Sequence, residues 1–267
     1  MNEEKWRDLI VPGKDENNLW ELFHENTKVR PFAPFLMADE IMERMKDIAE
    51  SLPLEQYPTI DLPAELIPLT RSIEETLRTR VSTRDFHPDP ISLRELATIL
   101  FYSYGVTRDN VGTDFPRPLR IVPSGGALYP LDIFFHTKCV PELKPGLYHY
   151  NPCRNCVRLL REEDLTEQLA ETLILLQRNL ARNCSIMFLI SALFERSIFK
   201  YGARGYRFIM MEAGHVAQNL NLVTNALGLG SVNICGYYDQ EVDELLGMDG
   251  LTQSTIYMIA VGSKRDA

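Results

Sequence analysis

The sequence has no excess of positive charge and no apolar run long enough to cross a bilayer. Its 267 residues include 28 Lys and Arg against 37 Asp and Glu, whereas broad nucleic-acid binding requires a surplus of basic residues. The longest apolar stretch, Cys184 to Phe194, is about half as long as a membrane span. The acidic start of the chain does not resemble a signal peptide. We therefore expect a cytoplasmic protein that binds neither nucleic acid nor membranes.

Cysteines are few, and they do not form a regular framework. Five are present, an odd number that favours a reducing compartment. Cys153 and Cys156 make a lone Cys-x-x-Cys pair, but a zinc site would need two further ligands. A thioredoxin-like pair would lie at the start of a helix, whereas this one falls in an expected hairpin turn. We interpret both as ordinary cysteines and predict no metal site.

Common signatures of nucleotide binding and hydrolysis are missing as well. No trio of glycines follows a strand in the dinucleotide-binding pattern, and no phosphate loop with Gly-Lys-Ser/Thr is present. Ser124 lies in Pro-Ser-Gly-Gly rather than in the Gly-x-Ser-x-Gly turn of a hydrolase. Any phosphate site or catalytic group must therefore be built from other patterns.

The first 70 residues differ in composition from the remainder. One amphipathic stretch, Asp39 to Ser51, has apolar residues at helical spacing, and six prolines lie around it: Pro31, Pro34, Pro53, Pro58, Pro63 and Pro68. Such a segment is more typical of an extension that packs on a neighbouring core than of a domain that folds alone. We predict an N-terminal extension over residues 1–70 and one large domain over 71–267.

Helices and strands alternate irregularly in this domain. Ser72 with Glu75, and Ser92 with Glu95, have the spacing of capping boxes that open helices. A third helix is expected from Asp164, with Leu165, Leu169, Leu173, Leu176 and Leu180 on one face. Strands are expected at Leu131–His136, Gly146–Tyr150, Val157–Leu160, Ile186–Ile190, Ser231–Cys235 and Ile256–Val261. This order predicts an α+β fold with a mixed central sheet flanked by helices.

The longest helical pattern, Tyr206 to Leu227, is apolar around much of its circumference. We therefore expect it to be buried, which an interface between subunits would also achieve. Glu212 and His215, three residues apart, share one face of this helix. We interpret them as a buried structural pair rather than a catalytic one.

Basic residues gather at two places that could hold a phosphate group. Arg80, Ser82 and Arg84 alternate in an expected extended segment, so their side chains point the same way, and arginine forks match phosphate oxygens. Lys264 and Arg265 follow the last expected strand. From these residues alone, a solvated basic loop and a frayed tail explain the pattern somewhat better, because surface charge is common.

Two further patterns could line a ligand. Gly125 and Gly126 follow Ser124 in a loop whose backbone can approach a flat ligand closely, although a plain turn would explain them equally well. Lys200 and Tyr201 lie in an expected loop punctuated by glycines, where the lysine could lower the pKa of the phenol and create a general base. A half-buried tyrosine beside a snorkelling lysine is the common alternative.

Together these motifs resemble the flavin-binding nitroreductase superfamily. Arg80-x-Ser82-x-Arg84 resembles its first FMN motif, although Val81 stands where many members carry another arginine. The runs that are similar to the SagB-type, or azoline dehydrogenase, branch are Pro123-Ser-Gly-Gly-Ala-Leu-Tyr-Pro130, Lys200-Tyr201 to Phe208, and Glu212-Ala-Gly-His215 to Asn219. The resemblance covers about residues 57–265, and it overturns the interpretation of a solvated basic loop.

The resemblance implies an obligate homodimer with two FMN sites at its interface. Arg80, Ser82 and Arg84 would hold the phosphate and ribityl end of FMN. The other cofactor-binding residues that it implies are Lys264 or Arg265 at the phosphate, Ser124 and Gly125 along the flavin, and Cys235 and Gly236 with backbone near its reactive N5 edge.

The same resemblance implies oxidation of a thiazoline or oxazoline ring in a peptide to the aromatic azole. The ring loses one proton and one hydride. Lys200 and Tyr201 match the Lys-Tyr pair that acts as the base in this branch, and oxidised FMN would take the hydride. Because the azoline must first be made from a Cys, Ser or Thr of a precursor peptide, a cyclodehydratase complex is an expected partner.

Two other functions fit the same residues, because one fold can carry many activities. The first is an NAD(P)H-dependent nitro- or quinone reductase, which rapid reduction of FMN by NAD(P)H without any peptide would favour. The second is a non-catalytic flavin-binding subunit of a modification complex, which FMN binding without turnover of any donor would favour.

Overall fold

The computed structural model describes residues 19–31, 37–112 and 116–264. The chain divides into two compact units, Met1–Phe35 and Leu36–Ala267. In the first unit, helix α2 (Leu19–Asn26) ends where the Thr27 hydroxyl donates to the Phe23 carbonyl at 2.6 Å. The second unit contains the sheet and the other described helices. The domain boundary expected at residue 70 stays a prediction.

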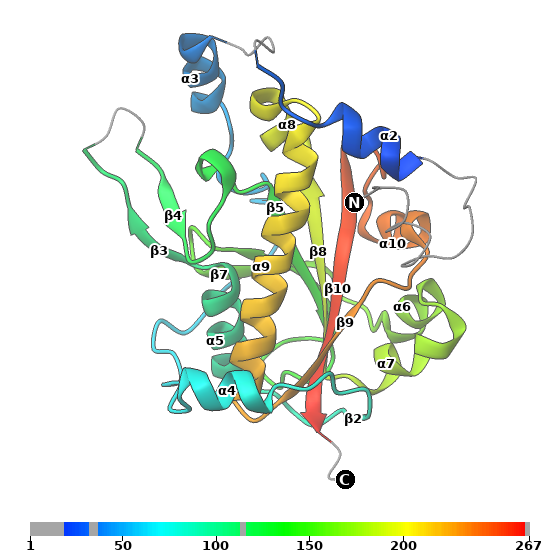
Figure 1. Cartoon of the computed structure of the whole chain (residues 1–267). Coiled ribbons are helices and arrows are strands. Elements are labelled where there is room, and N and C mark those ends of the chain that lie inside the picture. The colour runs from blue at the N-terminus through cyan, green and yellow to red at the C-terminus, as the bar shows by residue number, and fades with distance from the viewer. Residues whose placement is uncertain (1–18, 32–36, 113–115, 265–267) are drawn as a thin grey trace. The chain divides into compact units, whose positions relative to one another are not determined.

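An eight-stranded sheet forms the centre of the second unit (Figure 1). Its strands follow the order β1-β7-β6-β5-β8-β10-β2, and β9 also pairs with β10. The ladders between these strands are antiparallel, and an isolated parallel bridge joins Ser82 to Ser231. The strands are β1 (Thr59–Asp61), β2 (Phe86–His87), β5 (Leu131–Thr137), β6 (Gly146–Asn151), β7 (Cys156–Arg161), β8 (Ile186–Leu193), β9 (Gly230–Ile234) and β10 (Gln253–Lys264), and a separate ribbon pairs β3 (Val106–Asp109) with β4 (Pro118–Arg120).

Capping side chains mark where two of the described helices begin. At Ser92, the hydroxyl and the Glu95 side chain form the predicted reciprocal capping box, and the Ser72 hydroxyl accepts from the Glu75 N–H. The helices of this unit are α3 (Ala38–Lys46), α4 (Ile73–Thr79), α5 (Leu93–Tyr104), α6 (Thr166–Thr172), α7 (Arg178–Asn183), α8 (Glu195–Tyr201), α9 (Arg204–Ala226) and α10 (Asp239–Leu246). Within the described ranges, none of the helices is both long enough and apolar enough to span a bilayer.

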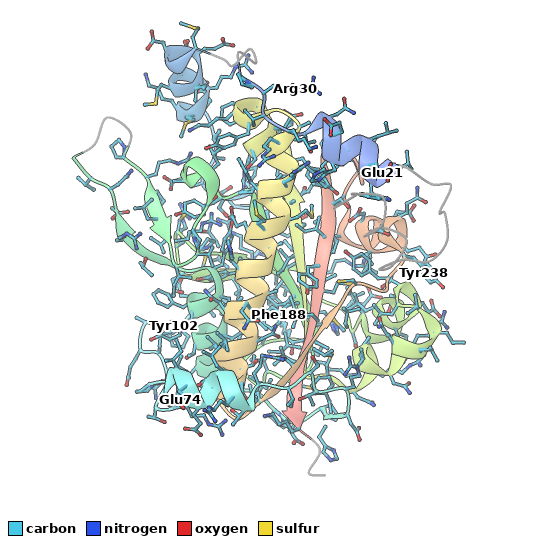
Figure 2. The ribbon with its side chains drawn as sticks, viewed as in Figure 1. Glu21, Arg30, Glu74, Tyr102, Phe188 and Tyr238 are labelled. Carbon is cyan, nitrogen blue, oxygen red and sulfur yellow. The ribbon has the colours of Figure 1, made fainter. Side chains whose placement is uncertain are left out.

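The sheet separates two apolar layers, because successive residues of a strand point to opposite faces. On one face, Phe135 of β5 and Phe188 of β8 pack with α5 and α9. Figure 2 labels Phe188 in this layer. On the other face, Phe134 of β5 packs with residues of α6, α7 and α10. This is the α+β fold with a central sheet flanked by helices that the sequence predicts.

The helix expected from Asp164 to Leu180 is interrupted, which corrects that prediction. α6 ends at Thr172, and Leu173 adopts an extended conformation with φ −89° and ψ 149°. Leu173 bridges to Tyr237, and the Ile174 N–H donates to the Gly236 carbonyl at 3.1 Å. These contacts with a distant segment replace the hydrogen bonds that a continuous helix would have made.

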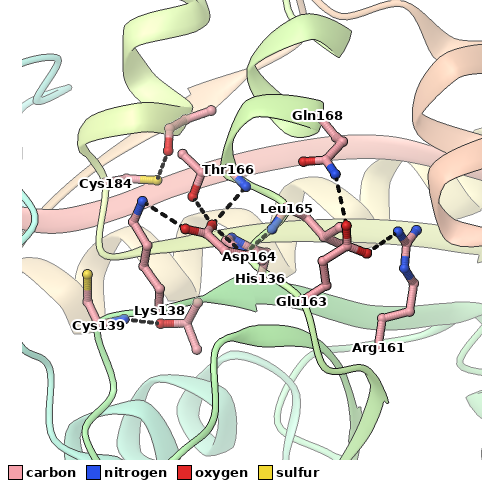
Figure 3. Close-up of polar contacts among 12 residues, drawn as sticks. His136, Lys138, Cys139, Arg161, Glu163, Asp164, Leu165, Thr166, Gln168 and Cys184 are labelled. Atoms are coloured by element: carbon pink, nitrogen blue, oxygen red, sulfur yellow. Dashed lines mark hydrogen bonds and ion pairs between the residues drawn. The ribbon is translucent and has the colours of Figure 1, made fainter.

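A polar cluster of His136, Lys138, Asp164 and Thr166 beside α6 has a structural role (Figure 3). The His136 Nε2 accepts the Leu165 N–H at 3.0 Å, and burial lowers the pKa of His136 to about 4. Asp164 accepts from Thr166 and from Lys138 and so secures the start of α6. A neutral imidazole that accepts a backbone donor is a satisfied buried histidine.

The Cys-x-x-Cys pair lies in the hairpin of β6 and β7, with Cys153 in the turn and Cys156 as the first residue of β7. The Asn151 side chain accepts from the Cys153 N–H at 3.0 Å. Both thiols are free, and burial raises the pKa of each. Since a reactive cysteine needs a lowered pKa, the pair has the properties of ordinary cysteines.

Candidate active site

The segment after α4 carries Arg80, Ser82 and Arg84 along the start of β9. Ser82 bridges to Ser231, and the Thr83 N–H donates to the Ser231 carbonyl at 2.9 Å. Arg80 is half-buried, whereas Ser82 and Arg84 are exposed. The structure therefore holds the backbone of the segment on the sheet and leaves these polar side chains available to a ligand.

Lys264, at the end of β10, belongs to the same group of residues. The Asn225 amide donates to the Thr76 carbonyl at 3.0 Å and to the Thr79 hydroxyl at 2.9 Å, and its oxygen accepts from Lys264 at 3.2 Å. Asn225 thus joins Lys264 to the helix turn that precedes Arg80. Burial, followed by the charge of Arg71, lowers the pKa of Lys264. Arg265 lies outside the described residues.

This group suits the phosphate end of FMN. Two guanidinium groups, an ammonium group and a hydroxyl supply the donors that a phosphate dianion requires. A bound anion would also offset the positive charge of Arg71, which adds to burial in lowering the pKa of Lys264. We call Arg80, Ser82, Arg84 and Lys264 the phosphate-site residues. Sequence reasoning missed Asn225, whose only signal is a polar residue in the last turn of an apolar helix.

Cys235 and Gly236 lie where β9 ends, at the opposite end from Ser231. Four residue steps along a strand amount to about 13 Å, a span that an extended FMN can follow from its phosphate towards its ring system. Cys235 is exposed. A side chain at Gly236 would lie 2.8 Å from Ile174 Cδ1, so backbone there is tightly packed.

Ser124 and Gly125 lie on the turn that precedes β5, beside α9. The Ser124 hydroxyl accepts the Tyr129 N–H at 2.9 Å and hydrogen-bonds the carboxyl of Glu212. A Cβ atom at Gly125 would lie 3.3 Å from Phe208 and 3.5 Å from Tyr201. The structure therefore brings this loop to the Lys-Tyr pair, and the Ser124 hydroxyl is engaged within the protein.

Lys200 and Tyr201 are the last two residues of α8, which corrects the expectation of a loop. The helix stops at Gly202, whose φ of 56° ends the regular backbone. A Cβ atom at Gly126 would lie 2.7 Å from the Tyr201 hydroxyl and 2.8 Å from the Lys200 Nζ. The two polar atoms are thus at most about 5.5 Å apart, the sum of those distances. Gly126 makes their convergence possible.

Burial changes the proton affinities of the pair in opposite directions. Burial raises the pKa of Tyr201, so the expected lowering of this pKa by Lys200 is wrong in the single chain. Burial, followed by the charge of Arg117, lowers the pKa of Lys200. Desolvation disfavours the charged form of each group, so it makes the free amine of Lys200 more available and the phenolate of Tyr201 less available.

Glu212 supports the loop from inside the protein. It is 3% exposed, it accepts from the Tyr104 hydroxyl at 2.9 Å, and burial raises its pKa to about 7 against the hydrogen bonds from Ser124 and Tyr104. Glu212 is buried and paired, as predicted. His215 is exposed, so the two do not form the expected pair.

We predict that Glu212→Gln changes how stability depends on pH. A carboxyl with a higher pKa in the folded state makes the folded protein less stable as pH rises from about 4.5 to about 7. Relative to the wild type, the variant should therefore gain about 3 kcal/mol of unfolding free energy across this range. Urea unfolding at pH 5 and pH 8 measures it, with the exposed Glu171→Gln as control. Parallel changes in variant and wild type would contradict the expectation.

Helix α8, which ends with the Lys-Tyr pair, and the end of β10, which carries Lys264, lie near opposite ends of α9 (Figure 1). Phe208, which packs against Tyr201, and Asn225, which binds Lys264, are 17 residues apart on this helix. That separation corresponds to about 25 Å along the helix axis. A single chain therefore does not bring all the predicted site residues around one point.

Comparisons with known proteins agree with this fold and these motifs. The Nitroreductase family model matches residues 77–263. MJ1384 of Methanocaldococcus jannaschii, whose name describes it as a nitroreductase, is 36% identical over 72% of this chain and 91% of its own length. The microcin B17-processing protein McbC of Escherichia coli is 29% identical over 55% of each chain. The trifolitoxin-processing protein TfxB of Rhizobium leguminosarum bv. trifolii is 26% identical over 76% of this chain and 56% of its own length.

Solved structures show the same fold. A nitroreductase-type protein from Anabaena variabilis has a TM-score of 0.72 at 23% identity and covers 96% of this chain and 49% of its own. A chain of the Escherichia coli microcin synthetase McbBCD complex has a TM-score of 0.59 at 21% identity. The match covers 93% of this chain and 92% of that chain. A protein from Desulfovibrio desulfuricans, solved with FMN, has a TM-score of 0.50 at 17% identity. The match covers 73% of this chain and 88% of that chain.

The fold and the matched residues define a nitroreductase-like oxidoreductase. The chain belongs to the nitroreductase family, whose members generally bind FMN.

Proposed function

We propose that the protein is an FMN-dependent dehydrogenase that oxidises thiazoline or oxazoline rings in a modified peptide. The observation that carries the proposal is the convergence of the Lys200 Nζ and the Tyr201 hydroxyl at Gly126, beside the Ser124–Gly125 loop. Similarity to McbC and TfxB, two proteins that process peptides, supports a peptide substrate.

In this proposal the phosphate-site residues would hold the phosphate of FMN, and the backbone at Cys235 and Gly236 would line its ring system. Bound FMN would supply the two-electron acceptor for the hydride that leaves the azoline ring. Lys200 accepts the ring proton at Nζ, because its lowered pKa makes the free amine more available. The Tyr201 hydroxyl would orient the ring, and the half-buried Lys200 would then release the proton to solvent. Arg265 remains a further candidate at the phosphate.

We further propose that the active form is a homodimer in which each FMN site contains residues of both chains. The separation of about 25 Å along α9 between the two groups motivates this arrangement, as does the exposure of Met211, at 53%, on that helix. A symmetric pairing would bury such a face.

Complementation tests the shared site. Mixing Arg84→Ala chains with Tyr201→Phe chains should restore azoline oxidation, because one site of each mixed dimer receives two intact halves. Random pairing predicts roughly a quarter of wild-type activity. No recovery after mixing and exchange would show that each site belongs to one chain.

A cyclodehydratase is the proposed partner, because the substrate ring must be formed before it can be oxidised. The structural similarity to a chain of the McbBCD synthetase complex supports this partner class. The nitroreductase or quinone reductase function remains a second candidate, since MJ1384 is 36% identical to this chain.

The deciding experiment incubates the FMN-loaded protein with a thiazoline-containing peptide under air. Loss of two hydrogens from the peptide, measured by mass spectrometry, and bleaching of the flavin absorbance without oxygen are the expected results. Rapid bleaching by NAD(P)H with an unchanged peptide would favour the reductase function. Bound FMN that neither donor reduces would indicate a non-catalytic subunit.

A further inference from the structure

The segment ahead of the family domain reaches the Lys-Tyr pair. Residues 37–61 precede the family match, which starts at residue 77. Most of α3, in this segment, is exposed or half-buried, but the side chain of Met45 is 5% exposed. The Lys200 Nζ donates to the Met45 Sδ at 3.7 Å. Met45 is thus a contact of Lys200 contributed from outside the shared domain.

Two buried arginines hold the chain that follows α3. Arg120, 4% exposed, donates to the Glu50 carbonyl at 2.7 Å. Arg158, 0% exposed, donates to the Leu52 carbonyl at 3.1 Å, and β1 then pairs with β7. Buried guanidinium groups need their acceptors, so these bonds oppose release of the segment. The position of Met45 is therefore a built part of this unit.

Among the residues that the structure describes, few polar groups lie close to the Lys200 amine. Gly126 lies on one side and Met45 on another, and the ring of Tyr201 lies with its centroid 5.5 Å from the Nζ. Burial of the amine lowers the pKa of Lys200, and the charge of Arg117, which is 7% exposed, lowers it further. The charged neighbour is thus a cation, which disfavours a second positive charge.

We propose that Met45 is a positioning residue for Lys200, which keeps water from the amine and directs its Nζ towards Gly126. The proposal rests on the proposed function, in which Lys200 acts on the substrate ring. A thioether suits this place because it fills irregular space and is only a weak acceptor. A carbonyl or carboxylate there would hold the amine as an ammonium ion, whereas sulfur leaves it able to accept a proton.

Competitive acetylation of the full-length, FMN-loaded protein tests the proposal without requiring azoline oxidation. Labelling of Lys200 by acetic anhydride is measured by mass spectrometry across a pH series. Met45→Ala should admit water and leave roughly tenfold less free amine at neutral pH than in the wild type. Met45→Gln, which keeps the length of the side chain, should act in the same direction if the alanine variant folds poorly.

Two matched variants complete the experiment. Met45→Leu keeps an apolar contact, and Met37→Ala removes a methionine that is 75% exposed next to the same helix, so both should label as the wild type does. A wild-type labelling profile for Met45→Ala and Met45→Gln would overturn the proposal, as would an equal shift in Met37→Ala. If the wild type oxidises no azoline but Met45 still controls labelling, the proposed function fails and the role of Met45 stands.

Discussion

Lys200→Ala and Tyr201→Phe are expected to lose azoline oxidation while the protein stays folded and keeps its FMN. The Lys200 Nζ and the Tyr201 hydroxyl converge at Gly126, and a positioned base contributes roughly 10²–10⁴-fold to the rate. The phosphate-site residues lie about 25 Å away along α9, so the variants should retain FMN. Turnover of a thiazoline peptide is compared with the flavin spectrum and with thermal unfolding.

Matched substitutions separate this effect from a general loss of side chains. Lys144→Ala removes a lysine that is 65% exposed and ion-paired with Glu162, and Tyr102→Phe removes a hydroxyl from α5. Both should oxidise the peptide at the wild-type rate. Wild-type turnover by Lys200→Ala and Tyr201→Phe would show that the pair is structural. Loss of FMN or of dimerisation instead would show that the two residues support the site rather than act on the substrate.

Gly126→Ala is expected to reduce azoline oxidation by roughly 10²-fold, because a displacement of about 1 Å at a reacting group can cost that much. The added Cβ atom would lie 2.7 Å from the Tyr201 hydroxyl and 2.8 Å from the Lys200 Nζ, so both polar ends must move. The φ of 65° at this position adds a strain of about 1–2 kcal/mol for a residue with a Cβ atom. Peptide oxidation and FMN affinity are the two measurements.

Gly247→Ala is the control for backbone strain. Gly247 has a similar φ of 71°, but a Cβ atom there would have nothing within 4 Å. The two alanine variants should therefore lose similar stability, and only Gly126→Ala should lose turnover. Equal turnover in both variants would mean that the loop does not position the Lys-Tyr pair. A large loss of FMN from Gly126→Ala would place this loop in cofactor binding instead.

Features set by neighbouring residues could be predicted from the sequence. The capping box at Ser92 and Glu95 and the hairpin of β6 and β7 both formed as expected. The extended course of Arg80 to Arg84 also follows from its short alternating pattern. Each depends on hydrogen bonds or turns within a few residues, so sequence spacing was sufficient. The family motifs added the site residues, whose roles at FMN stay predictions.

Features that depend on distant segments were decided only by the tertiary structure. Leu173 leaves the helical pattern because it pairs with Tyr237, although its spacing favours a continuous helix. The course of α8 brings Lys200 into contact with Met45, a residue 155 positions earlier in the chain. Spacing along a sequence sets which side chains share a face of one element. It contains no information about which element will pack against that face, and the contact between Lys200 and Met45 arises from such packing.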